Sequence, residues 1–167
     1  MQVIQHVGGN QFDFVETFPA GLFNALTVLS ANAAYLTLVR VARPIVVTQI
    51  TYGLGTASGN VDLGIYDSAD GGTTLTRLGS TGSTAATGTN TTQTIALTAA
   101  VTLVPGKDYW LAFAVDNATL TPYRGANQTA PSIGGIGVRS VAKATAFPLP
   151  TSITGHSGGS TVWMLAN

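Results

Sequence analysis

Short runs of alternating apolar and polar residues, interrupted by turn-forming residues about every ten positions, constrain this fold most strongly. Val61, Leu63 and Ile65 alternate with other residues over positions 61–66, and a loop rich in Asp and Gly follows at 67–72. Residues 74–78 then return as the second arm of a predicted hairpin. Because successive side chains of a β-strand point to opposite faces, this pattern is typical of strands with one buried face. The sequence therefore predicts an all-β protein.

The same pattern predicts further strands over residues 35–41, 45–51, 93–97, 101–104, 109–115, 120–124 and 162–165. Residues 79–91 are mostly Gly, Ser, Thr and Ala, and we expect a surface loop there. Leu22, Phe23, Leu26 and Leu29 have helical spacing, but the segment is short and contains Thr27, so a helix is not favoured. Many short strands with frequent turns favour a single antiparallel β-sandwich of the jelly-roll type.

The predicted strand at 109–115 differs from the others because it is apolar on both faces. Tyr109, Leu111, Phe113 and Val115 lie on one face, and Trp110, Ala112 and Ala114 on the other. A strand of this kind needs a second cover outside the sandwich. We expect either a terminal segment or a neighbouring subunit to supply it.

The chain of 167 residues is long enough for one domain. We divide it into an N-terminal arm, residues 1–30, and a sandwich domain, residues 31–167, with a loop-rich C-terminal part at 125–160. A large apolar side chain left in water costs about 1.5–3 kcal/mol. Interface candidates are therefore the apolar residues of the arm and one strand tryptophan: Phe12, Phe14, Phe18, Leu22, Phe23 and Trp110.

Charged residues make up only 8% of the chain, with seven basic and seven acidic side chains. An ordinary domain has about a quarter of its residues charged. Little self-repulsion remains to keep copies apart, so a homo-oligomer is expected. The basic residues are scattered, which argues against nucleic-acid binding. The sequence shows no cysteine, secretory signal or membrane-spanning run, so we expect a protein made in a cytoplasm and not inserted into a membrane.

No residue pattern points to catalysis. His6 and His156 lie far apart without a third ligand at metal-like spacing. Asp67 and Asp70 faintly resemble part of a calcium loop, but turn formation explains them with fewer assumptions. We predict no catalytic, metal or cofactor-binding residue and no enzymatic activity. Aromatic faces suit sugar stacking, which makes three side chains glycan-stacking candidates: Trp110, Tyr123 and Trp163.

Several segments resemble a module of tailed-bacteriophage virion proteins. They are ANAAYL at 31–36, ITYGLGTASGNVDLGIYD at 50–67, RLGSTGST at 77–84, LVPGKDYWLA at 103–112 and FPLP at 147–150. The resemblance covers roughly residues 32–150 and implies a jelly-roll sandwich of the kind found in capsid decoration proteins, head fibres and tail or receptor-binding parts. It brings no catalytic or metal-binding residue with it.

Two functions follow as expectations. The first is a structural virion protein that decorates a capsid, with the major capsid protein or other virion proteins as partners and a trimer as the favoured oligomer. The alternative is a tail-associated module that binds a carbohydrate or a host receptor, since similar sandwiches also occur as carbohydrate-binding modules.

Overall fold

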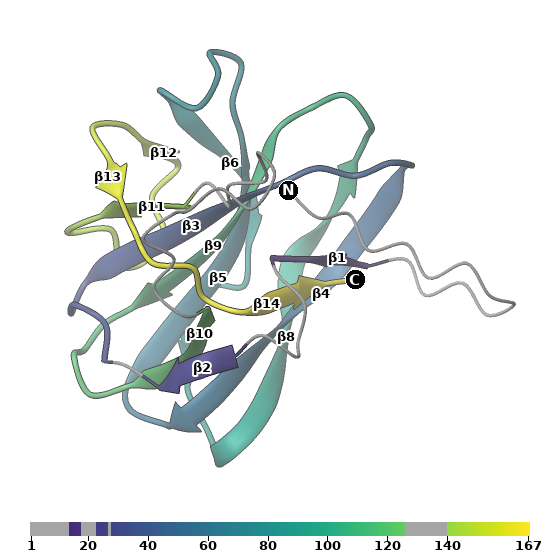
Figure 1. The fold of residues 1–167 in the computed structure, drawn as a ribbon. Helices are drawn as coiled ribbons and strands as arrows, with labels where there is room; N and C mark the ends of the chain where they lie inside the picture. The colour runs from purple at the N-terminus through teal and green to yellow at the C-terminus, as the bar shows by residue number, and fades with distance from the viewer. Residues whose placement is uncertain (1–13, 18–22, 27, 126–139) are drawn as a thin grey trace, which may run out of the picture.

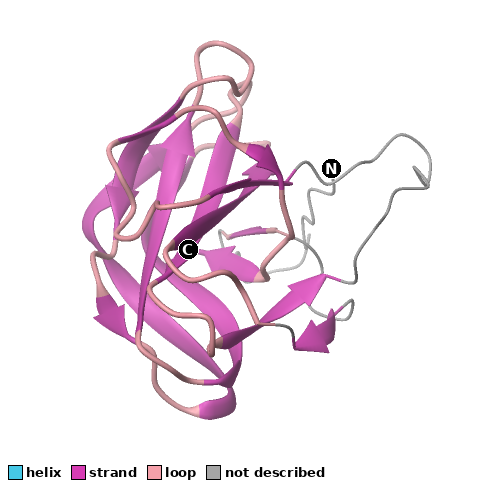
Figure 2. Ribbon diagram, turned by 90° about the vertical axis from the view of Figure 1, so that its left-hand side faces the viewer, coloured by secondary structure: helices cyan, strands magenta, loops and turns pink. Residues whose placement is uncertain are grey.

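The computed structural model describes residues 14–17, 23–26, 28–125 and 140–167. Within these residues the chain forms strands and loops without a helix (Figure 2). Two antiparallel sheets pack face to face, so the predicted all-β sandwich is confirmed (Figure 1).

The first sheet has six strands arranged around a long central strand, β4 (Ile45–Thr56). One edge of β4 pairs along its length with β8 (Thr89–Leu103). The other edge pairs with two shorter strands, β14 (Met164–Ala166) and β10 (Thr121–Gly125). Beyond them lie β1 (Val15–Glu16) and β2 (Phe23–Leu26).

The second sheet has eight strands. Its centre consists of β6 (Leu75–Ser80), β5 (Asn60–Asp67), β9 (Tyr109–Val115) and β3 (Ala33–Val39), in that order. Short strands extend it: β12 (Ser152–Ile153) beside β6, β11 (Ser140–Lys143) and β13 (Ser157–Gly158) beyond β3, and β7 (Thr84–Ala85) on β5.

The order of the principal strands identifies the topology. It runs β2-β10-β4-β8 in one sheet and β3-β9-β5-β6 in the other. Among these eight strands, successive strands lie in opposite sheets except β5 and β6, which form a hairpin. Eight strands in two such sheets form a jelly roll, as the sequence predicted.

The core lies between the two sheets and uses the residues that the alternation selects. Val61, Leu63 and Ile65 of β5 are fully buried there. Tyr52 from the first sheet packs on Phe113 from the second, with ring centroids 5.3 Å apart. Inward-facing side chains of both sheets interdigitate in this way in sandwich proteins.

The threonine-rich stretch after β6 was predicted wrongly. The expected loop at 79–91 contains the end of β6, strand β7 and the start of β8, and the strands expected at 93–97 and 101–104 form one strand. A bulge joins them, because Val47 pairs with Val101 whereas Gln49 pairs with Ala96. Outward side chains of an edge strand need not be apolar, so the pairing depends on the partner strand rather than on hydrophobic alternation.

The described parts of the predicted N-terminal arm belong to the six-stranded sheet. Val15 is buried in the core, and the Thr17 hydroxyl donates a hydrogen bond of 3.0 Å to the Val162 carbonyl. Among the interface candidates of the arm, Phe14 is half-buried and Phe23 lies in β2. Phe12, Phe18 and Leu22 lie outside the described residues.

Candidate interaction surfaces

The outer face of the eight-stranded sheet is covered by residues 146–153, which we call the strap. Beneath it lies a second apolar cluster formed by residues of β3, β5, β6 and β9 together with strap residues. Trp110, Ala112 and Ala114 of β9 all have 0% exposure there. Of the two covers considered for this strand, the structure therefore has the terminal segment.

Polar groups of the sheet hold the strap in place. Asp62 accepts a 3.0 Å hydrogen bond from the Leu149 amide, and the Tyr66 hydroxyl donates one of 2.6 Å to the Pro150 carbonyl. Arg77 donates from its guanidinium to the Leu149 carbonyl and from its amide to the Thr151 carbonyl. Each bond joins a backbone group of the strap to a polar group of the sheet, and those of the buried Leu149 satisfy groups that would otherwise lack a partner.

Gly64 allows the strap to approach closely. A Cβ atom at this position would lie 2.7 Å from Leu149 Cδ1 and 2.9 Å from the Gly79 carbonyl oxygen. The missing side chain therefore makes room for Leu149 above the sheet.

Asp62 is the buried carboxylate under the strap, with 1% exposure. Burial raises its pKa above 3.8, while hydrogen bonds from Leu149 and Thr81 and the charge of Arg77 act in the opposite direction. The sequence analysis missed Asp62 and Arg77. The available signal was a carboxylate at an outward position of a strand that neighbours the doubly apolar strand at 109–115.

Trp110 was predicted as an interface residue and as a glycan-stacking residue, and its complete burial contradicts both roles. The strap occupies the surface that a sugar ring or a neighbouring subunit would need. His156 packs near the indole, with ring centroids 6.4 Å apart, and donates a 2.7 Å hydrogen bond from Nε2 to the Gly72 carbonyl. His6 lies outside the described residues.

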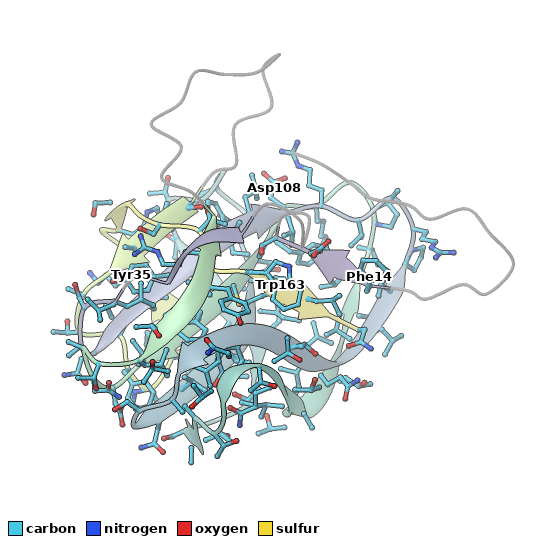
Figure 3. The ribbon with its side chains drawn as sticks, turned by 60° about the horizontal axis from the view of Figure 1, so that its bottom comes forward. Phe14, Tyr35, Asp108 and Trp163 are labelled. Atoms are coloured by element: carbon cyan, nitrogen blue, oxygen red, sulfur yellow. The ribbon has the colours of Figure 1, made fainter. Side chains whose placement is uncertain are left out.

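The other two stacking candidates come together on the outer side of the six-stranded sheet. The Trp163 amide donates a 2.9 Å hydrogen bond to the Tyr123 carbonyl. Trp163, labelled in Figure 3, is only 6% exposed, and its indole N–H donates to Glu16 at 2.6 Å. Tyr123 is half-buried, and its ring lies over Gly53, where a Cβ atom would be 2.1 Å from Tyr123 Cδ2. Little of the Trp163 ring is therefore available for stacking.

The outer side of β4, β8, β10 and β14 carries a surface that we call the uncharged face. Its side chains alternate with core residues, and none is charged: Val46, Thr48, Gln49, Thr51, Thr92, Thr94, Ala96, Thr102, Tyr123 and Leu165. The Glu16 carboxylate of β1 borders this face, because Glu16 pairs with Leu165 and accepts the hydrogen bond of the Trp163 indole. Val46 is 58% exposed, and the hydroxyls of Thr51 and Thr94 are 2.7 Å apart across the two strands. Hydroxyl and apolar groups thus alternate over this face.

Charged residues gather instead at one end of the sandwich. Of seven basic and seven acidic residues, Asp13 and Arg139 lie outside the described part, which leaves twelve. Six of these twelve lie in or beside the three loops that join β3 to β4, β5 to β6 and β8 to β9, toward the top of Figure 1: Arg40, Arg43, Asp67, Asp70, Lys107 and Asp108.

A polar cavity of about 470 Å³ opens at this charged end. Its lining includes Asp67, Ser68 and Lys107, and the Arg40–Asp108 ion pair. The cavity is shallow and open to solvent rather than enclosed.

The acidic loop at 67–72 uses Asp70 as a turn-forming residue. Its carboxylate accepts hydrogen bonds from the Ser68 hydroxyl and from the amides of Thr73 and Thr74. These bonds, led by that of the Thr74 amide, lower the pKa of Asp70 to about 2. Turn formation therefore accounts for the position of this carboxylate.

Two general features can be stated for the described ranges. They bring together no group of three or more His, Asp or Glu side chains that could hold a metal ion. They also include no helix of the length and apolarity needed to cross a membrane.

Comparisons with protein families, with curated proteins and with solved structures gave no match. The functional argument therefore depends on the fold and on the surfaces described above.

Proposed function

We propose that this chain is a non-enzymatic structural component of a bacteriophage virion, a decoration protein that binds the outer shell and stabilises it. The proposal combines the sequence resemblance with a surface suited to packing. It assigns the uncharged face as the contact with the major capsid protein or another virion protein.

The observation that carries the proposal is the lack of charged side chains on the outer face of β4, β8, β10 and β14; Arg124 of β10 is buried. Protein–protein interfaces have cores depleted of charged residues, because burying a charge without a partner is costly. Threonine hydroxyls can donate and accept hydrogen bonds, so this face can bind another protein without burying an unpaired charge. The charged end would remain in solvent.

Cosedimentation with shells of the virus that encodes the chain tests this proposal. We expect saturable binding by the native chain and at least tenfold weaker binding by the double variant Val46→Lys, Thr51→Lys, because it places two charges in the contact. Leu78→Lys is the matched control, since Leu78 is an exposed apolar residue of β6 outside the uncharged face. Failure of the native chain to bind shells would contradict the proposal.

The polar cavity favours a second candidate function, a tail-associated module that binds a carbohydrate or host receptor. Carboxylate, hydroxyl and ammonium groups converge there on a volume of about 470 Å³, although Trp110 is unavailable for stacking. A glycan array tests this candidate. Binding that is lost in the variant Asp67→Asn, Lys107→Ala would favour it, and a blank array with the native chain would argue against it.

A further inference from the structure

Strand β8 forms an edge of the six-stranded sheet, and its first half lacks the usual features that protect an edge. Among the strands that the structure describes, it pairs with β4 alone. Natural edge strands are blocked by charge, proline, a bulge or short length. The edge strands β12 and β13 of the other sheet have two residues each. Residues 91–96 of β8, in contrast, contain no charge and no proline and precede the bulge.

The hydrogen bonds of the sheet show which backbone groups face this open edge. Met164 bonds to Thr17 through both its amide and its carbonyl, so these groups point away from β4. Its partner Tyr52 therefore directs its own amide and carbonyl to Gln93 of β8. Alternation along β8 then turns the backbone groups of Thr92, Thr94 and Ala96 outward.

These three residues are exposed, and within the described part of the chain no backbone group bonds to their outward amides and carbonyls. The Thr91 hydroxyl makes a long local contact of 3.4 Å with the Thr92 carbonyl. Beyond the bulge the edge is covered, because Thr98 bonds to the Ser80 carbonyl of β6 and Val101 lies against Gly79. The open edge thus extends over residues 91–96, since Asn90 has a positive φ of 50° and interrupts the extended backbone.

We propose that this open edge pairs antiparallel with the same edge of a second copy, joining two six-stranded sheets into one across a twofold axis. In an antiparallel pair, two residues directly opposite each other both direct their backbone amides and carbonyls toward the partner strand, or both direct them away from it. A twofold pairing therefore centres on one residue and its own copy, either Gln93 or Thr94. A charge at the centre of such a pair would face itself, and this segment has none.

A second copy is the favoured occupant because the edge complements itself in every respect that the sequence controls. Its outward donors and acceptors alternate identically in both copies, and its flanking side chains are small and neutral. The biological use of such a dimer rests on the proposed assembly role, but the test of the pairing needs only the purified chain. Shell binding could fail while the dimer remains, so the two proposals fail separately.

Sedimentation equilibrium of the full chain, at concentrations up to about 1 mM, tests the pairing. We expect a dimer for the native protein and a more than tenfold weaker dimer for Thr94→Lys and for Thr94→Glu. An equimolar mixture of these two variants should recover the dimer, because opposite charges then meet across the axis. Thr94→Pro should also weaken it, because it removes an outward amide without removing a bond to β4.

Thr102→Lys is the matched control, because Thr102 lies on the same strand and the same face but beyond the bulge. It should leave the dimer unchanged. A monomer at every concentration would overturn the proposal, and so would an oligomer that the Thr94 variants do not weaken. If Thr102→Lys weakened the dimer as much as Thr94→Lys, the contact would lie on the face instead of the edge, which would also overturn it.

Discussion

The two sheets of this sandwich differ in how their outer faces are treated. The eight-stranded sheet carries a large apolar surface around Trp110 and covers it with the strap from its own chain. The six-stranded sheet carries mainly uncharged side chains on β4 and β8, of which Val46, Thr92 and Thr94 are exposed, and no described segment pairs with the outer edge of β8 before its bulge. An uncharged β surface can therefore serve in two ways. The covered face of the eight-stranded sheet contributes to folding, and the face of the six-stranded sheet is available for a partner.

The largest expected effect comes from removing the indole under the strap. Trp110→Ala should lower the free energy of unfolding by about 3–5 kcal/mol, because it leaves a cavity beneath the covered face. Chemical denaturation measures this loss. A change below about 1 kcal/mol would mean that the strap is not packed on this sheet as described.

Adding one methyl group between sheet and strap should cost less. Gly64→Ala is expected to destabilise by about 1–3 kcal/mol, since the new Cβ would be too close to both Leu149 and the Gly79 carbonyl. Gly158→Ala is the matched control, because no atom lies within 4 Å of its added Cβ. Equal stability of the two variants in thermal or chemical unfolding would contradict the close contact.

The buried carboxylate should make the covered face sensitive to pH. Burial raises the pKa of Asp62 above 3.8, so the folded state prefers the protonated acid. Its contribution to stability is complete below pH 3.8 and is lost as the pH rises through the higher pKa of the folded state.

Asp62→Asn should remove this contribution. The difference in unfolding free energy between native chain and variant should change by at most about 1.4 kcal/mol per pH unit in that window. Denaturation at a series of pH values measures it. Asp70 and Asp116, whose pKa values are lowered, change stability in the opposite direction, but they are present in both proteins and cancel in the difference. Parallel pH profiles would contradict the assignment.

The smallest effect on folding is expected on the uncharged face. Val46→Thr should change stability by less than about 0.5 kcal/mol, because this side chain is 58% exposed and already in contact with solvent. Thermal unfolding checks this value. A loss as large as that of Gly64→Ala would show that the two faces do not differ in the way described.

The sequence predicted the elements that carry a clear apolar signal. The β5–β6 hairpin follows from the alternation of Val61, Leu63 and Ile65, whereas β9 and its need for a second cover follow from a run that is apolar on both faces. Strand β8 was predicted poorly, because threonine at an exposed edge carries no hydrophobic signal. One signal could have indicated an uncharged β surface in this region: no charged residue lies between Arg77 and Lys107.

The position of the strap could not be predicted from periodicity. Residues 146–153 are held by hydrogen bonds with Asp62, Tyr66 and Arg77, which lie about 70 to 90 positions earlier in the chain. Pairing of such distant residues depends on the finished sheet. For the same reason the sequence could nominate Trp110, Tyr123 and Trp163 together, although the fold places Trp110 on the opposite side from the other two.

The strap also has a consequence for biosynthesis. A ribosome makes the strand that carries Trp110 well before it makes the segment that covers it. The roughly 40 residues between them take about 2–8 s to add at 5–20 residues per second. During that interval the growing chain exposes an apolar sheet surface that the finished protein never shows. The nascent chain therefore has a brief period in which it is most exposed to aggregation and most accessible to a chaperone.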